Sequence, residues 1–169
     1  MAMIHSFRMF AIKAHGDQRY GEHPYAVHLA HVEHILEQSG YGTDKWRAKA
    51  WLHDLFEDTC KVEELDVMRK MVRELFSDEV EEDCWSVSGF GVNRAARNLC
   101  IKEKILINPR AAILKCADRL GNVEFSSGTR KHGMVAKYRS ENADFETYIR
   151  PHVPEAMWKR LERSLFDKD

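Results

Sequence analysis

Residues 48–59 read Ala48-Lys49-Ala50-Trp51-Leu52-His53-Asp54-Leu55-Phe56-Glu57-Asp58-Thr59. The first part of this stretch predicts a helix that enters the protein core with Trp51 and Leu52. The second part places an imidazole and three carboxylates directly behind that helix. Carboxylates are almost never fully buried unless they are paired or bind a metal. The stretch by itself leaves two interpretations open: a solvated acidic helix end, or a site of metal ligation or acid–base chemistry.

The spacing within this stretch favours a site with more than one component. In a continuous helix, His53 and Glu57 would lie one turn apart on one face, and Asp54 and Asp58 would form a second pair beside them. The side chains of His53 and Asp54 would point about 100° apart around the helix axis. An ion bound between these two residues would therefore need further ligands from other helices.

The composition is that of an ordinary globular protein. The chain has 169 residues, of which 44% are hydrophobic and 31% are charged, so one domain over residues 1–169 with a sizeable core is expected. The formal net charge is -1. Such a balance gives no general attraction to nucleic acids or membranes, so we expect neither as a partner. The oligomeric state is left open.

The four cysteines are scattered along the chain without a CxxC pair. This spacing favours reduced thiols over a zinc knuckle or a disulfide framework. The N-terminus lacks the charged and apolar regions of a signal peptide, and no apolar run approaches transmembrane length. We therefore expect a cytoplasmic protein.

Helical periodicity in nearly every long segment predicts an all-α fold. The irregular segment is 80–98, where Trp85-Ser86-Val87-Ser88-Gly89-Phe90-Gly91 interrupts the pattern. Asn108-Pro109 is expected to begin a helix that continues past Gly121. The other expected helices cover about residues 3–15, 25–39, 43–54, 62–76, 134–139 and 154–166.

Two further residues stand out as possible partners for the His53–Asp54 pair. His28 lies at the edge of the apolar stripe of its helix, whereas His31 and His34 are expected to face solvent. Asp118 lies in a largely apolar helix, where it is either a member of a structural ion pair or a ligand. Two imidazoles and two carboxylates would suit a divalent cation such as Mn²⁺, Fe²⁺, Zn²⁺ or Co²⁺.

Four segments together carry a family resemblance. They are His15-Gly16-Asp17-Gln18-Arg19, Pro24-Tyr25-Ala26-Val27-His28, Leu52-His53-Asp54 with Glu57-Asp58-Thr59, and Lys115-Cys116-Ala117-Asp118-Arg119-Leu120-Gly121-Asn122. This arrangement resembles the HD-domain superfamily of metal-dependent phosphohydrolases. More narrowly, it is similar to the hydrolase domain of the RelA/SpoT type and its small stand-alone relatives, including the metazoan SpoT homologue. The resemblance implies a single compact multi-helix HD domain with a metal site in its helical core.

The resemblance also implies roles for individual residues. The positions that match the metal ligands, usually of Mn²⁺ in this subgroup with Fe²⁺, Co²⁺, Zn²⁺ or Mg²⁺ as alternatives, are His28, His53, Asp54 and Asp118. Glu57 and Asp58 match the acidic pair that positions or activates the attacking water. Positions that match substrate contacts are Asn122, Arg19 and, by a looser alignment, Tyr138.

The residue chemistry adds further candidates for substrate binding. Arg94 and Arg97 lie three residues apart beside a glycine-rich turn, and arginine binds phosphate oxygens in a bidentate way. Tyr20 and Tyr25 are near His28 in the sequence, and either could border a nucleobase pocket. Each of these residues could equally have a structural or solvated role.

The expected function is therefore metal-dependent hydrolysis of a phosphorylated nucleotide. The first hypothesis is a 3′-pyrophosphohydrolase that removes the 3′-pyrophosphate of guanosine-3′,5′-bis(diphosphate) with a metal-activated water. Hydrolysis of a nucleoside mono- or triphosphate is an alternative, and a non-catalytic nucleotide-binding HD module is another. The chain departs from the RelA/SpoT pattern at Tyr20, at Leu29 and in a loop before Arg19 that looks one residue shorter, so the substrate is the open question.

Overall fold

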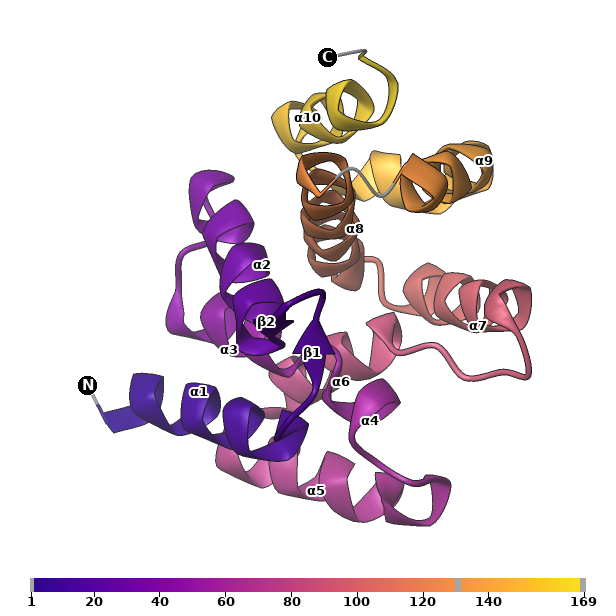
Figure 1. Cartoon of the computed structure of the whole chain (residues 1–169). Coiled ribbons are helices and arrows are strands. Elements are labelled where there is room, and N and C mark those ends of the chain that lie inside the picture. Colours follow the sequence, from indigo (N-terminus) through magenta and orange to yellow (C-terminus); the bar gives the residue numbers. More distant parts are fainter. Residues whose placement is uncertain (1, 130–131, 168–169) are drawn as a thin grey trace.

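The chain folds into packed helices with one short hairpin, so the expected all-α class is confirmed (Figure 1). The computed structural model describes residues 2–129 and 132–167. None of the helices in these residues is long and apolar enough to cross a bilayer. The helices are α1 (Ala2–His15), α2 (Ala26–Gln38), α3 (Asp44–Leu52), α4 (Leu55–Asp58), α5 (Leu65–Leu75), α6 (Asp78–Val87), α7 (Arg94–Ile107), α8 (Ala111–Gly128), α9 (His132–Ile149) and α10 (Glu155–Phe166), with 3₁₀ turns at Val62–Glu64 and Arg150–His152.

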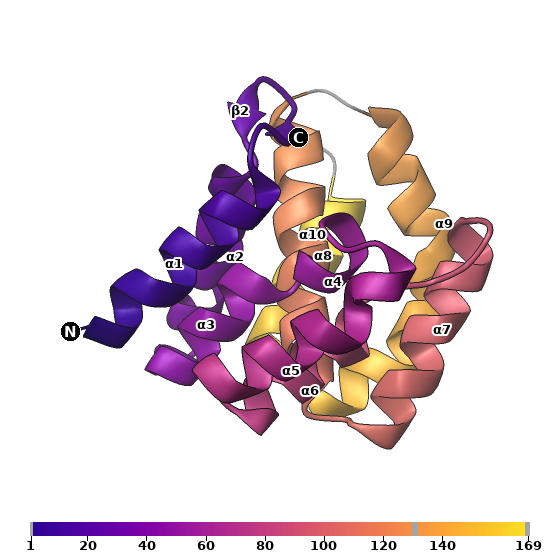
Figure 2. The same ribbon diagram turned by 90° about the horizontal axis from the view of Figure 1, so that it is seen from below.

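Helix α8 is the central element, and α2, α6, α9 and α10 pack against it (Figures 1 and 2). Its side chains are small or apolar around most of the circumference, and such a helix belongs in a core. The fully buried residues include Ala112, Leu114, Ala117, Leu120 and Val123. Any polar residue on α8 is therefore carried into the interior of the molecule.

The third helix does not run through the His53–Asp54 pair, and the expectation of a continuous helix was wrong. Helix α3 ends at Leu52, and the one-turn helix α4 begins at Leu55. Asp54 lies between them with φ -95° and ψ 1°, outside the α-helical region and in a region where active-site residues often occur. Because of this break, the side chains of His53 and Asp54 do not have to point apart around a helix axis, as they would in a continuous helix.

The glycines and proline of residues 16–24 predict a loop, and this loop contains a short hairpin at residues 19–24. Strand β1 (Arg19–Tyr20) pairs antiparallel with β2 (His23–Pro24). Gly21 has φ 62°, a left-handed conformation that glycine adopts without steric cost. The hairpin places Tyr20 beside α8, where its ring centroid lies 4.0 Å from that of Phe125.

Three other expectations need correction. Helix α8 begins at Ala111 rather than at Pro109, because the carbonyls of residues 108–110 accept hydrogen bonds from the backbone N–H three residues further on and form turns. Helix α9 extends ten residues beyond the expected end at Arg139, to Ile149. The helical spacing of residues 62–76 predicts that Leu75 faces the core, but this side chain is 55% exposed at the end of α5. The irregular segment 80–98 contains most of α6, a turn that is buried at Ser88 and Gly89 and exposed at 91–93, and the start of α7.

A fully buried lysine joins α3 to α6. The ammonium of Lys49 lies 2.6 Å from Glu79 Oε1 and 2.7 Å from Asp83 Oδ2. Asp83 is also fully buried and accepts two hydrogen bonds from the Arg110 guanidinium. The hydrogen bond from Lys49 holds the pKa of Glu79 at about 2. A buried charge is tolerated only with such partners, so these ion pairs fix α3 against α6.

We expect Lys49→Met to lower the free energy of unfolding by about 3 kcal/mol, because it removes one partner of the buried Asp83 carboxylate. Urea denaturation followed by circular dichroism measures the change. The control is Lys45→Met, because Lys45 also pairs with Glu79 but is exposed. It should cost about 0.5 kcal/mol or less. Equal losses in the two variants would contradict the assignment.

Candidate metal centre

Four ligand atoms from three parts of the fold converge in the interior. They belong to His28 on α2, to His53 and Asp54 at the α3–α4 break, and to Asp118 on α8, and they all lie within 4.8 Å of one another. His28, His53 and Asp118 are buried, and Asp54 is partly buried. The packing of α2 against α8 thus brings together residues that are 90 positions apart in the sequence.

The distances between the ligand atoms are those of a coordination shell. His53 Nε2 lies 2.9 Å from Asp54 Oδ2 and 3.6 Å from Asp118 Oδ1. His28 Nε2 lies 3.2 Å from His53 Nε2, 3.3 Å from Asp118 Oδ1 and 3.5 Å from Asp54 Oδ2. Ligands about 2.1 Å from a metal ion are separated by roughly 3.0–3.4 Å in octahedral or tetrahedral geometry. The four residues therefore fit a divalent cation, and the identity of that cation stays a proposal.

The orientation of His53 is fixed by its other ring nitrogen. His53 Nδ1 donates a hydrogen bond to the carbonyl of Ala50 at 2.8 Å. This tautomer leaves the lone pair of Nε2 free to bind a cation. His28 differs, because its Nδ1 is buried without a hydrogen-bond partner among the described residues. On the Nδ1 side the ring is held by packing, and its centroid lies 4.8 Å from that of Tyr20.

The electrostatics of the cluster also favour a cation. Burial lowers the pKa of His53, but the neighbouring carboxylates of Asp54 and Asp118 outweigh it and raise the pKa well above its usual value. Burial raises the pKa of Asp118, yet Lys115 and the two imidazoles hold it well below the usual range. The ionised carboxylates thus favour positive charge between them, which either protonated imidazoles or a divalent cation can supply. Because protons and the cation compete for the imidazoles, cation affinity should rise with pH.

Hydrogen bonds from three neighbours orient the two carboxylates. The hydroxyl of Tyr25 donates to Asp54 Oδ2 at 2.5 Å. The ammonium of Lys115 lies 2.8 Å from Asp118 Oδ2, and the amide of Asn122 donates to Asp118 Oδ1 at 2.7 Å. The two interpretations of Asp118 are therefore compatible, since one oxygen pairs with Lys115 and the other faces the imidazoles.

A polar cavity of about 200 Å³ opens beside the cluster, and Asp54, Glu57, Asp58 and Asp118 line it. The backbone N–H of Gly89 donates to Glu57 Oε2 at 2.6 Å, and the side-chain amide of Gln18 donates to Asp58 Oδ2 at 2.7 Å. Burial raises the pKa of both Glu57 and Asp58. The structure thus brings both predicted water-handling residues to the cavity, on α4 and adjacent to the ligands.

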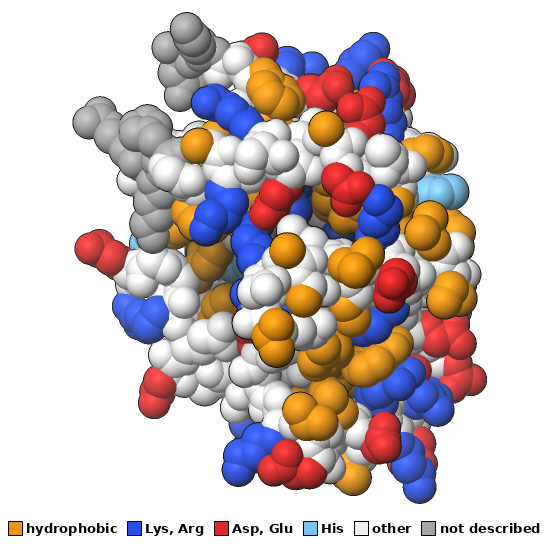
Figure 3. All heavy atoms as spheres, turned by 90° about the vertical axis from the view of Figure 1, so that its right-hand side faces the viewer, with side chains coloured by type: hydrophobic (Ala, Val, Ile, Leu, Met, Phe, Trp, Pro, Cys, Tyr) orange, Lys and Arg blue, Asp and Glu red, His pale blue; other side chains and the backbone are white. Residues whose placement is uncertain are grey.

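Basic residues line the opposite side of the same cavity. Figure 3 shows a hollow in the face that carries α7 and α9, with Lys and Arg side chains along its edges. Arg94 and Arg119 both pair with Glu141, and both lie over the ring of Tyr138. Arg97 also lines the cavity. In the part of the chain that the structure describes, no carboxylate pairs with Arg97, so its guanidinium is available to an anionic ligand.

The remaining predicted substrate contacts lie at different distances from this cavity. Asn122 and Tyr138 line it. Tyr20 does not, but its hydroxyl donates to Asn122 Oδ1 at 2.9 Å. Arg19 is exposed on the hairpin, where its guanidinium donates to the backbone carbonyl of Glu22 and does not reach the cavity. Tyr25 also lines the cavity, where its hydroxyl donates to Asp54 and its ring stacks on His15.

The histidines of α2 divide much as expected, with one exception. His28 is buried and His34 is exposed. His31, expected to face solvent, is partly buried and lies 3.0 Å from Glu124 on α8, because α8 covers that side of α2. All four cysteines are free thiols, as their spacing indicated.

Two groups that donate hydrogen bonds to Glu57 and Asp58 were not predicted from the sequence. Gln18 binds Asp58 across 40 positions, and Gly89 binds Glu57 across 32 positions through its backbone. Gln18 belongs to a segment of the family resemblance, which was the one signal that could have found it. No pattern marks a backbone N–H as a hydrogen-bond donor to a particular side chain.

Comparison with known proteins gives no family assignment. No family model matches the chain, and no curated protein matches it.

We expect Asp54→Ala to reduce Mn²⁺ affinity by about 100-fold or more, because the loss of even an outer hydrogen-bond partner costs 10–100-fold. Elemental analysis after equilibrium dialysis measures bound metal. Thermal unfolding provides a second readout, since Mn²⁺ at 100 times its Kd should stabilise the wild type by about 2.7 kcal/mol.

The control for this variant is His34→Ala. It removes an exposed imidazole from α2, the helix that carries His28, and should leave Mn²⁺ binding unchanged. Wild-type metal content in Asp54→Ala would remove the central assignment.

Proposed function

We propose that this protein is a metal-dependent phosphohydrolase of the HD type that acts on a phosphorylated nucleotide. The first candidate reaction is removal of the 3′-pyrophosphate from a guanosine alarmone such as guanosine-3′,5′-bis(diphosphate). One observation carries the proposal: the two carboxylates of the four-residue cluster line one cavity together with an acidic pair and with an arginine that has no carboxylate partner among the described residues. Ligands, a group to handle water and a group to bind an anion are thus side by side.

The roles of the residues follow from their contacts. His28, His53, Asp54 and Asp118 would hold the divalent cation, which supplies a polarising charge for a phosphoryl oxygen and lowers the pKa of water. Glu57 and Asp58 would orient the attacking water and accept its proton. Burial raises the pKa of Glu57, which brings this carboxylate closer to the range in which a general base is effective.

Arg97 is the basic residue best suited to the substrate. The other cations of the cavity already have carboxylate partners, because Arg94 and Arg119 share Glu141 and Lys115 pairs with Asp118. An incoming phosphate would have to compete with those carboxylates, whereas Arg97 could pair with it directly. Arg97, rather than Arg94, is therefore the proposed phosphate contact.

The size of the cavity bears on the choice of substrate. About 200 Å³ is smaller than the 300–1,000 Å³ of a typical pocket for a whole ligand, so the cavity suits the phosphate end of a nucleotide. Asn122 is the residue that the resemblance assigns to the nucleotide, but its side chain already binds Tyr20 and Asp118. Because these contacts occupy the residue that the resemblance assigns to the alarmone, nucleoside mono- and triphosphates are kept as a second candidate class.

A panel of nucleotides separates these candidates. Mn²⁺-loaded protein is incubated with guanosine-3′,5′-bis(diphosphate) and with nucleoside mono- and triphosphates, and the products are resolved by ion-exchange chromatography. Pyrophosphate release from the alarmone is expected. Orthophosphate or triphosphate release would favour the second candidate class. No turnover at full metal occupancy would leave a non-catalytic nucleotide-binding module.

We expect Glu57→Gln to retain Mn²⁺ but to lower kcat by about 10²–10⁴-fold, the usual contribution of a general acid or base. Its amide keeps the size of the side chain but accepts a proton poorly. The control is Glu63→Gln, the same change at an exposed glutamate of the 3₁₀ turn that follows α4. It should change neither metal content nor kcat. A wild-type kcat in Glu57→Gln would exclude the proposed role.

We expect Arg97→Ala to raise the KM for the phosphorylated substrate by about 10–100-fold, because a hydrogen bond to a charged group contributes about 1.5–3 kcal/mol. Arg97→Lys should recover part of this loss. The control is Arg73→Ala, which removes a guanidinium of α5 that does not line the cavity. A KM unchanged in Arg97→Ala would overturn the assignment of the phosphate contact.

A further inference from the structure

A single peptide group connects Glu57 to a lysine outside the cavity. The peptide between Ser88 and Gly89 uses its carbonyl oxygen to accept a hydrogen bond from Lys104 Nζ at 2.9 Å. The same peptide uses its N–H to donate to Glu57 Oε2 at 2.6 Å. Both ends of this peptide dipole are therefore held, by an ammonium at the carbonyl and by a carboxylate at the N–H.

The packing of Gly89 leaves this peptide no room to move. A Cβ atom at Gly89 would lie 2.9 Å from Ile101 Cδ1 and 3.0 Å from the carbonyl oxygen of Arg97. Both neighbours belong to α7, so that helix packs directly on the backbone of the turn. On the other side, Ser88 Oγ donates to the carbonyl of Cys84 in the last turn of α6.

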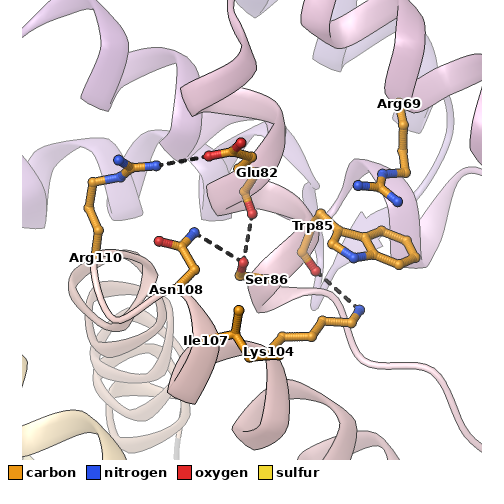
Figure 4. Close-up of a pocket in the computed structure, with 8 residues that line it drawn as sticks. All are labelled: Arg69, Glu82, Trp85, Ser86, Lys104, Ile107, Asn108 and Arg110. Carbon is orange, nitrogen blue, oxygen red and sulfur yellow. Dashed lines mark hydrogen bonds and ion pairs between the residues drawn. The ribbon is translucent and has the colours of Figure 1, made fainter.

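Lys104 reaches the peptide from a second pocket of about 430 Å³ between α5, α6 and α7 (Figure 4). In this view Arg69 lies above the Trp85 ring and Lys104 below it. The ammonium of Lys104 is 3.8 Å from the centre of that ring and also donates to the Trp85 carbonyl at 3.2 Å. An ammonium at carbonyls of a helix C-terminus is electrostatically favourable.

The other polar groups of this second pocket pair with groups of the protein itself. Arg110 pairs with Glu82, and Asn108 donates to Ser86 (Figure 4). Arg69 pairs with Glu81. Lys104 is the member of this lining set whose hydrogen bond leads on to the metal cavity. The hydrogen bond of Lys104 to the Ser88 carbonyl therefore links the second pocket to the metal cavity.

We propose that Lys104 is a positioning residue for Glu57, acting through the Ser88–Gly89 peptide. The inference rests on the proposed function, in which Glu57 handles water. The positive charge at the Ser88 carbonyl polarises the peptide and strengthens the hydrogen bond that its N–H gives to the carboxylate. That bond fixes Oε2, and in the described residues Oε1 has no hydrogen-bond partner, so Oε1 is the oxygen left for water.

The test compares Lys104→Met with the wild type in the metal-loaded protein. We expect kcat to fall about tenfold, a part of the 10²–10⁴-fold that a general base contributes, with KM and metal content unchanged. Lys104→Arg should recover most of the loss, because a guanidinium still donates to the carbonyl. In a Glu57→Gln background, Lys104→Met should have no further effect on kcat, since the two residues act in series.

Amide hydrogen exchange of Gly89 gives a readout that needs no activity. We expect faster exchange in both Lys104→Met and Glu57→Gln. The matched control is Lys102→Met, which removes a lysine of the same helix that pairs with Asp144, and it should leave kcat and Gly89 exchange unchanged. Should Lys104→Met not fold, Lys104→Gln carries the same measurements.

The outcomes separate this inference from the proposed function. No hydrolysis by the wild type, combined with faster Gly89 exchange in Lys104→Met, would overturn the proposed function but support the connection between Lys104 and Glu57. Hydrolysis by the wild type, with kcat and Gly89 exchange unchanged in Lys104→Met, would overturn the positioning role. A full effect of Lys104→Met in the Glu57→Gln background would also overturn it.

Discussion

Two carboxylates in the helical core have to be neutralised, and the rest of the structure depends on how this is done. Asp54 and Asp118 face His28 and His53 at 2.9–3.6 Å. Buried charge of this kind is stable only with partners held in good geometry. The requirement fixes α2, the α3–α4 break and α8 relative to one another, and the same geometry creates a set of ligand atoms suited to a divalent cation.

Other charged residues of the fold follow the same rule and thereby shape the cavity. Lys49 and Arg110 neutralise the buried Asp83, and Arg94 and Arg119 share Glu141. These ion pairs hold α3, α6, α7, α8 and α9 in place around the cavity. Three of the four cations that line the cavity have carboxylate partners, so the one that has none in the described residues is informative about function. Arg97 is this cation, and it lies beside the candidate metal centre.

The turn between α6 and α7 connects two parts of the molecule that would otherwise be independent. Its Ser88–Gly89 peptide is bound by Lys104 on one side and by Glu57 on the other. A backbone group is a suitable connection because α7 packs tightly on it and it has no rotatable side chain. In the proposed arrangement Glu57 is positioned by Lys104, which lies in the second pocket, as well as by its own helix α4.

The sequence by itself determined the all-α class and the residues that could form a metal site. Helical periodicity placed α1, α2 and α10 almost to the residue, because each has an apolar stripe of regular spacing. Polar residues in apolar surroundings singled out His28, His53, Asp54 and Asp118. Such signals are local, so they can be recognised without knowledge of the fold.

The tertiary structure alone decided how these residues meet and which neighbours serve them. The break at Asp54, the hydrogen bond of Gln18 to Asp58 and the hold of Gly89 on Glu57 depend on contacts across 29 to 40 positions. The packing of α7 against α9 also gives Glu141 to Arg94, whereas no carboxylate of the described residues pairs with Arg97. Long-range packing sets these choices, and no spacing along the chain encodes them.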